Sequence, residues 1–378
     1  MPKFSKILIL VFLVIFVSIG FVIPRFSYAQ TEGTVYVCPD AESLEEINPR
    51  CQGKIILRLG EMVNGMTLIT TSYEGKDYYL VLGFKNGGGA VNLPPTPNAG
   101  GPYQGDAGLP ITFDASNSTD PNADPLQYRW DFENDGIWDT EWLSTSTANH
   151  IWNNDYEGVV KLEVNDGEFA RTATTSVKVI SPKTFKEESI SELESFRDGE
   201  KKIDKKIDKI IWFINKSLNE NLWLDASHLV FFEKWFEDFN EKEFEEMFDK
   251  PEWTGPKSGI VVFHYEKVAV RLMIDEIKSK KTPEKIGQVF EEVITKLVKA
   301  DQLLAQVSLF DAKNTPIQNP KFKKIVDNQI EIAEKELQKA EQELTKNRLD
   351  KAIPKLAKSW LHSQLAIKLA NSEVKPQT

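Results

Sequence analysis

Motifs that mark common enzymes and nucleic-acid-binding proteins are missing from this 378-residue sequence. It has no Gly-x-Ser-x-Gly elbow, no His-Glu-x-x-His motif and no phosphate-binding loop. Lysines and arginines number 46 against 57 aspartates and glutamates, and no basic stripe with interleaved aromatic residues stands out along the chain. A net charge of −11 repels phosphate backbones. We therefore expect no nucleic-acid partner, no enzyme activity and no organic cofactor.

The first 29 residues are typical of an export signal. Lys3 and Lys6 precede the apolar run Ile7–Ile23, which at roughly 17 residues is slightly short of the ~20 that span a bilayer. Pro24 ends the run, and Ser27-Tyr28-Ala29 places small residues at the −3 and −1 positions of a cleavage site. We predict a signal peptide over residues 1–29 and a protein that is secreted or held at the cell surface. A retained N-terminal membrane anchor is the alternative; without it we expect no membrane insertion.

Cysteine is scarce, and its two copies lie close together in a β-rich segment, residues 30–92. Cys38 and Cys51 of an exported chain are expected to form a disulfide, which suits a module too small for a large core. Two free thiols are the alternative. Zinc is not expected, because the four histidines are scattered along the chain. Three runs are strand-like: Thr34–Val37, Lys54–Leu59 and Asp77–Leu82.

Residues 93–182 predict a β-sandwich. The segment opens with the proline-rich spacer Leu93–Pro97, and short strand-like runs separated by Asn-, Asp- and Gly-rich turns follow it. Within the run Leu126–Phe132, alternate residues are apolar, which indicates a strand with one buried face. The other expected strands are Ile111–Phe113, Val159–Val164 and Thr172–Val179.

Four motifs in this segment closely resemble those of the PKD domain. They are AGGPY at Ala99–Tyr103, FDASNSTDP at Phe113–Pro121, YRWDF at Tyr128–Phe132 and VNDG at Val164–Gly167. The resemblance implies a seven-strand Ig-like sandwich without an internal disulfide. It also implies an extracellular module that binds a partner or acts as a spacer, and that does not catalyse. One departure is visible: Glu133-Asn134 stands where the family usually has a single glycine, so the turn there is one residue longer.

Residues 184–374 predict a bundle of five or six amphipathic helices. Lysine and glutamate become dense, and apolar residues recur every three or four positions, as in the series Ile203, Ile207, Ile210, Ile214. A long coiled coil is the weaker alternative, because prolines such as Pro251 interrupt the pattern. The fold class is therefore multidomain: a small β module, a PKD-type sandwich and an all-α bundle.

Oxygen-bearing side chains in two turns of the sandwich are candidate calcium ligands. Asp120, Asn122 and Asp124 stand at alternate positions of one turn, and Asp131 and Asp135 belong to another. Calcium prefers several carboxylate, amide and carbonyl oxygens, so a structural calcium ion is the candidate cofactor. The alternative is that these side chains only bond the backbone of their own turns.

Aromatic residues supply the candidate binding surface. Trp138, Trp142 and Trp152 fall near predicted loops and edge strands of the sandwich, where exposed rings can stack on sugars or anchor a protein. Filling of the core is the alternative role. The favoured function is binding or adhesion at the cell surface towards a protein or a glycan. A structural spacer that displays the helical module is the alternative, and a hydrolase with an unrecognised site is less expected.

Overall fold

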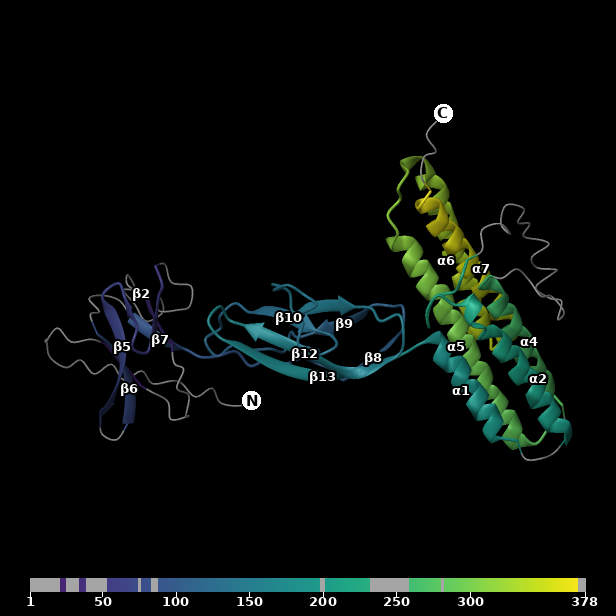
Figure 1. Ribbon diagram of the computed structural model, residues 1–378, viewed down its shortest axis with the longest axis horizontal. Helices are drawn as coiled ribbons and strands as arrows, with labels where there is room; N and C mark the ends of the chain where they lie inside the picture. Colours follow the sequence, from purple (N-terminus) through teal and green to yellow (C-terminus); the bar gives the residue numbers. More distant parts are fainter. Residues whose placement is uncertain are drawn as a thin grey trace.

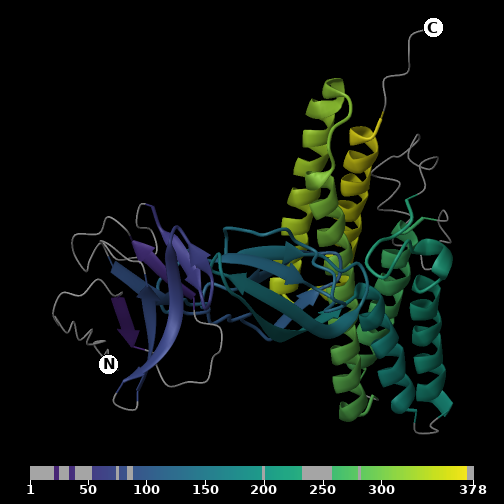
Figure 2. The same cartoon turned by 60° about the vertical axis from the view of Figure 1, so that its left-hand side comes forward.

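The computed structural model describes residues 21–24, 34–38, 53–73, 76–82, 88–197, 201–231, 258–279 and 282–372. These form two small β-sheets, a β-sandwich and a group of helices, in chain order (Figure 1). Both views place the sandwich between the N-terminal sheets and the helices (Figures 1 and 2). The predicted multidomain fold class is confirmed. No helix in the described ranges is long and apolar enough to cross a membrane.

The N-terminal strands form two sheets, with strand orders β3-β2-β7 and β1-β6-β5-β4. Their common core is small, with Val35, Leu57 and Leu68 fully buried. β2, β3 and β6 lie where the apolar runs predict strands. The strand bounds are β1 Phe21–Pro24, β2 Thr34–Cys38, β3 Ile55–Arg58, β4 Met62–Val63, β5 Met66–Tyr73, β6 Lys76–Leu82 and β7 Gly88–Asn92.

Two predictions for this part extend beyond the described residues. β1 pairs antiparallel with β6 although it lies inside the predicted signal, and the rest of residues 1–29 is outside the described ranges. Cys38 ends β2 with a side chain that is 1% exposed, and no described cysteine is free. Cys51 lies outside the described residues. The export signal and the Cys38–Cys51 disulfide therefore stay predictions.

Six strands build the sandwich, one fewer than the PKD resemblance implies. One sheet has the order β10-β12-β13-β8, with β8 parallel to β13, and β9 pairs with β11 in the facing sheet. An isolated bridge between Thr96 and Thr119 adds a further contact at the N-terminal end. The bounds are β8 Tyr103–Asp106, β9 Ile111–Asp114, β10 Gln127–Asp131, β11 Thr147–His150, β12 Tyr156–Asn165 and β13 Ala170–Ile180.

Alternation along β10 produces the core of the sandwich. Tyr128 and Trp130 point inward, and Phe113 from β9 meets Trp130 with ring centres 5.5 Å apart. The ring centre of Phe132 lies 5.1 Å from that of Phe113, and Phe132 is also buried. Such aromatic pairs supply large apolar areas and favourable tilted packing in one place. Arg129, between the two inward residues, is left on the outer face.

The turn that departs from the PKD pattern is accommodated by two residues in the left-handed region. Asn134 has φ +50° and Gly136 has φ +92°. Asparagine tolerates this conformation better than most residues, and glycine has no Cβ to clash. The additional residue therefore lengthens the turn without disturbing β10.

The C-terminal part contains six α-helices in the described residues. The longest, α5, packs against α1, α4, α6 and α7 and so forms the centre of the group. α2 lies against α4 at the edge farthest from the sandwich in Figure 1. The bounds are α1 Pro182–Ser195, α2 Lys201–Ser217, α4 Ile260–Ile277, α5 Glu284–Asn314, α6 Lys323–Thr345 and α7 Leu349–Ala370.

A charged triad is buried among α1, α4 and α5. The Lys186 ammonium contacts the Glu266 carboxylate and lies 3.7 Å from Asp301, and all three side chains are inaccessible to solvent. The Trp223 ring faces the ammonium at 5.3 Å. Burial and the Glu266 charge raise the pKa of Asp301 well above its usual range. Both buried carboxylates therefore face the same ammonium group.

Removing the ammonium should destabilise the helical part strongly. Lys186→Met leaves Glu266 buried without its counter-charge, which typically costs about 3–5 kcal/mol. Urea denaturation followed by far-ultraviolet circular dichroism measures the change. Lys351→Met, at an exposed position of α7, is the matched control and should change stability by less than about 0.5 kcal/mol. Equal effects of the two substitutions would contradict the role given to the triad.

Candidate functional site

Two tryptophans are held against basic side chains on the outer face of the sandwich. The Arg129 guanidinium carbon lies 4.2 Å from the ring centre of Trp138 and 4.4 Å from that of Trp142. Lys161 of β12 places its Nζ 5.0 Å from the Trp138 ring. Glu163 accepts a 2.6 Å hydrogen bond from Arg129 Nε. We call these five residues the tryptophan platform.

Local structure explains why these side chains meet. Arg129 and Glu163 are direct cross-strand partners in the β10–β12 register. After the turn, the chain runs back beside β10, where the Asp139 N–H donates to the Trp130 carbonyl and Tyr128 bridges to Leu143. This returning segment covers the free edge of β10 and carries both tryptophans over the outward Arg129.

The platform remains accessible. Trp138 and Trp142 are both half-buried, and the neighbouring Ile137 is 69% exposed. Cations beside an indole are attracted by its π electrons and hold the ring in place. The platform therefore offers ordered aromatic surface together with charged groups of both signs, which suits contact with sugars or with a protein.

The third predicted contact residue, Trp152, belongs to the core. It is 9% exposed, and its ring stacks on Tyr156 with centres 5.0 Å apart. Its indole N–H donates to Glu133 at 3.0 Å. The prediction that Trp152 contacts a ligand is therefore wrong: its ring fills the end of the sandwich.

The predicted calcium ligands are split between two places. Asp131 lies at the far end of β10 from Asp124, and its two oxygens accept hydrogen bonds from the N–H groups of Asp135 and Gly136. Asp135 in turn accepts from Ile137 N–H at 2.8 Å. Asp131 and Asp135 thus bond the backbone of their own turn, which is the alternative role expected for them.

The other half lies where the N-terminal module meets the sandwich. Asp120 Oδ1 accepts hydrogen bonds from the N–H groups of Asn122 and Asp124, and Asn122 accepts from Leu93 N–H at 2.8 Å. Asn92 donates to Asp166 across this joint. Within the described residues, several buried oxygens here have no hydrogen-bond partner: Asn92 Oδ1, Asp120 Oδ2, Asp124 Oδ2 and both carboxylate oxygens of Glu168.

Negative charge accumulates at this joint. Burial, followed by the charge of Asp120, raises the pKa of Asp124 to about 6, and Asp166 and Glu168 act in the same direction. Lys54 from the N-terminal module opposes them and lies 3.7 Å from Glu168. No group of three His, Cys, Asp or Glu side chains in the described ranges already converges on a metal position. A cation here would need the amide oxygen of Asn92 or backbone carbonyls in addition to the carboxylates.

A second joint connects the sandwich to the helices. Ser181 caps α1, and the Asp155 carboxylate accepts hydrogen bonds from the Ser181 N–H, the Ser181 hydroxyl and the Thr184 hydroxyl at 2.7–2.8 Å. Lys299 of α5 pairs with Asp106 of β8 at 3.0 Å. A Cβ on Gly108 would lie 2.7 Å from Val307, so the sandwich backbone approaches α5 closely.

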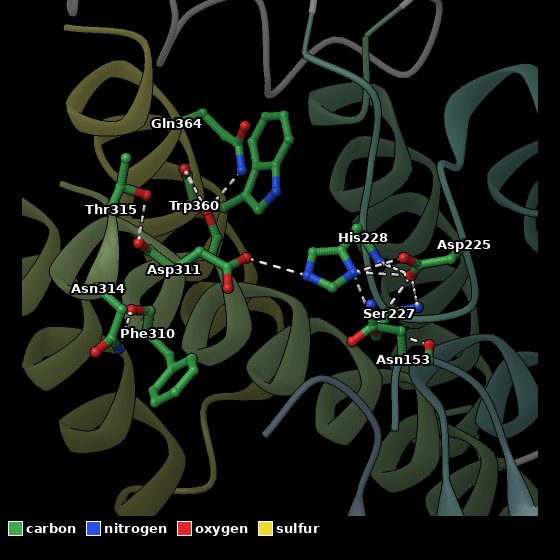
Figure 3. Close-up of polar contacts among 11 residues, drawn as sticks. Asn153, Asp225, Ser227, His228, Phe310, Asp311, Asn314, Thr315, Trp360 and Gln364 are labelled. Atoms are coloured by element: carbon green, nitrogen blue, oxygen red, sulfur yellow. Dashed lines mark hydrogen bonds and ion pairs between the residues drawn. The ribbon is translucent and has the colours of Figure 1, made fainter. Parts of the chain in front are cut away.

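A histidine completes this second joint (Figure 3). His228 Nδ1 lies 2.8 Å from Asp225, and its Nε2 lies 3.1 Å from Asp311 of α5. The Ser227 hydroxyl donates to the backbone carbonyl of Asn153 in the sandwich at 2.9 Å. Burial opposes protonation of the ring, but the hydrogen bonds and charges of Asp225 and Asp311 outweigh it and raise the pKa of His228 to about 9.

The Ser227–His228–Asp225 group resembles a hydrolytic triad in composition only. A triad base needs a neutral imidazole with one nitrogen facing the nucleophile and the other held by a carboxylate. Here the ring is protonated at neutral pH, and carboxylates occupy both nitrogens. The group therefore has no free base and acts as an ion-paired clamp.

A cavity of about 420 Å³ lies between Phe231 and the C-terminal end of α7. Its described lining contains amide, hydroxyl, amine and apolar side chains, and neither a carboxylate nor an imidazole. General acid–base catalysis usually depends on one of those two groups. The lining residues are Phe231, Gln364, Ile367, Lys368, Asn371 and Ser372.

Residues 92–180 match the family model of the PKD domain. The match begins at the buried Asn92 and ends at the last residue of β13, so it coincides with the sandwich. The chain therefore contains a PKD domain, and the resemblance noted in the sequence is confirmed. No curated protein matches the chain.

Solved structures match parts of the chain only. Carbohydrate-binding modules of the β-sandwich superfamily share 28% identity over 24% of this chain and 35% of theirs, with a TM-score of 0.21. A nucleoside hydrolase-related protein from Saccharophagus degradans shares 23% over 24% of this chain and 26% of its own, with a TM-score of 0.19. The N-terminal four Ig domains of Dscam1 share 14% sequence identity with this chain. The match covers 43% of this chain and 42% of the Dscam1 chain, with a TM-score of 0.20. The chain thus spans less than half of each structure.

The His228 clamp should make stability depend on pH. Its pKa is raised from 6.5 to about 9, so its contribution is complete below pH 6.5 and is lost as the pH rises through 9. We expect the difference in unfolding free energy between the wild type and His228→Asn to shrink over this range. Chemical denaturation at several pH values measures it. His362→Asn is the matched control, and a difference for His228→Asn that does not vary with pH would contradict the clamp.

Proposed function

We propose that this protein is a non-enzymatic binding protein of the cell exterior, in which the PKD domain contacts a glycan or a protein through the tryptophan platform. The observation that supports this most directly is the pair of accessible tryptophans fixed on Arg129. Each ring is half-buried, so part of its surface is open to a partner, and fixing it beforehand lowers the entropy lost on binding.

The chemistry of the platform favours partners with both apolar and polar surface. Indole rings stack on the C–H faces of sugars and on apolar side chains, while Arg129, Lys161 and Glu163 offer hydrogen bonds at the rim. The export signal predicted from residues 1–29 supports a position where such partners occur. Secretion and display at the surface are both consistent with that signal.

A spacer function is the second candidate, and the joint with the helices favours it. Asp155, Lys299 and the His228 clamp connect the sandwich to α1 and α5 by hydrogen bonds and ion pairs. A sandwich held in this way keeps the helices at a fixed distance from the N-terminal module, as the elongated arrangement in Figure 1 illustrates. The two functions are compatible, because a spacer can also bind.

Removal of the rings should abolish binding through the platform. We expect Trp138→Ala/Trp142→Ala to weaken binding to a glycan array or to purified envelope proteins by at least about tenfold, equivalent to 1.4 kcal/mol. Val159→Ala, at an exposed position of β12, is the control, and thermal melts check that each variant is folded. Binding that survives the double substitution would contradict the platform. A wild-type protein that retains no glycan and no envelope protein would favour the spacer.

We further propose that a calcium ion stabilises the joint between the N-terminal module and the sandwich. Asn92 is 3% exposed and Asp124 is 7% exposed, and each has an oxygen without a hydrogen-bond partner among the described residues. With Asp120 and Glu168 they form a set of hard oxygen donors of the kind calcium prefers. This ion would neutralise carboxylates that otherwise repel one another.

Calcium should raise the melting temperature of the full-length protein at pH 7.5. About 2 mM calcium, in the range that extracellular modules bind, should increase it by several degrees relative to EDTA. Asp124→Asn should raise the melting temperature in EDTA, because an ionised Asp124 with its raised pKa destabilises the fold, and should remove the response to calcium. Asp135→Asn, at the other end of β10, should leave that response intact. No calcium response in the wild type would contradict the site.

A further inference from the structure

The outer face of α2 carries a stripe of positive charge with one aromatic side chain. Helix geometry places six residues of this face within an arc of about 100°. All six are exposed. We call them the lysine–tryptophan stripe: Lys201, Lys202, Lys205, Lys209, Trp212 and Lys216.

The charges of this stripe are not neutralised within the described ranges. Asp208, at its edge, pairs with Arg197 at 2.7 Å. Lys206, on the flank of α2, pairs with Glu276 of α4. None of the five stripe lysines forms an ion pair with a residue that the structure describes. Among the residues that the structure describes, the stripe therefore presents only lysine charges, on a protein whose net charge is −11.

Such a face weakens the isolated helix. Lysines four positions apart repel one another by a few tenths of a kcal/mol per pair. Trp212 is 52% exposed, whereas Ile207, Ile210 and Ile214 of the same helix are fully buried. Lys216 Nζ lies 5.2 Å from the Trp212 ring. Trp212 therefore does not fill the core. Contact with an external partner would explain its exposed position beside the lysines.

We propose that the lysine–tryptophan stripe binds an anionic glycan, with Trp212 stacked on a sugar ring and the lysines paired with its carboxylate, sulfate or phosphate groups. Fifteen residue steps from Lys201 to Lys216 extend about 22 Å, the length of a chain of several sugars. A helix ridge of this length suits an extended polymer better than a small anion.

The other polyanionic surface that such a helix can meet is a membrane. An interfacial helix binds lipid by inserting its apolar face. The apolar face of α2 is already buried against the other helices, with Ile207, Ile211 and Phe213 in the core. A single tryptophan is then all that the stripe offers to the acyl region. The balance of one aromatic ring and five cations favours a charged glycan.

Polygalacturonate, a carboxylated glycan, tests the proposal with the full-length protein. We expect binding that weakens as salt increases, no binding to neutral dextran, and at least about tenfold weaker binding by Lys205→Gln/Lys209→Gln. The matched control is Lys324→Gln/Lys351→Gln, which removes the same charge from exposed positions of α6 and α7. Circular dichroism and thermal melts confirm that both variants are folded.

Polyglutamate separates the contribution of the ring from that of the charge. Trp212→Ala should weaken binding to polygalacturonate severalfold and leave binding to polyglutamate unchanged, because polyglutamate has no sugar ring. Equal binding of the stripe and control variants, or tighter binding of the wild type to phosphatidylglycerol vesicles or single-stranded DNA than to polygalacturonate, would overturn the proposal. Trp138→Ala/Trp142→Ala should bind polygalacturonate as the wild type does, so failure of this proposal is distinct from failure of the platform.

Discussion

Burial of Trp130 against Phe113 and Phe132 is the constraint on which the sandwich depends. Because residues of a strand alternate between faces, fixing Trp130 inside fixes Arg129 outside. Arg129 in turn fixes Trp138 and Trp142 on the returning segment. A shift of β10 by one residue would place the cation in the core and remove the platform. The geometry of the proposed binding surface is thus a direct consequence of core packing.

The two ends of the sandwich differ in how they are connected. At the helical end, Asp155, Lys299 and His228 join complementary charges and hydrogen bonds, so this connection is electrostatically satisfied. At the N-terminal end, carboxylates gather with Lys54 as the neighbouring cation, and several buried oxygens lack partners among the described residues. The joint with the helices is therefore satisfied by its own side chains, and the proposed calcium site lies at the joint with the N-terminal module. The joint with the helices is thus expected to be insensitive to cations, whereas the joint with the N-terminal module is expected to respond to them.

Much of the fold follows from local sequence rules. The alternation from Leu126 to Phe132 predicts β10, the Asn-Asp-Gly turns predict the ends of strands, and spacing of three and four predicts the helices. Trp138 and Trp142 were predicted as contact residues from their place near loops. The sequence does not predict that Arg129 is their cationic partner. Its contact with the two rings depends on how the chain returns beside β10.

Other features depend on tertiary structure and leave no signal in the sequence. The turns that carry Asp124 and Asp131 are near neighbours in sequence, but only Asp124 lies beside the N-terminal module, because strand β10 separates the two turns. Trp152 and Trp142 are similar in sequence context, but only Trp152 turns inward. The stripe on α2 differs from these features, because its lysines recur at helical spacing in the sequence and are only interrupted there by Asp204 and Asp208. In the triad, Lys186 meets Glu266, which is 80 positions away in the sequence.

The central claim is that the segment returning beside β10 is a binding surface. Hydrogen–deuterium exchange of the full-length protein, with and without native envelope material, tests it most directly. Amides of residues 137–143 should become protected when material binds, while strand β9 of the facing sheet stays unchanged. Bound material that leaves residues 137–143 unprotected would contradict it.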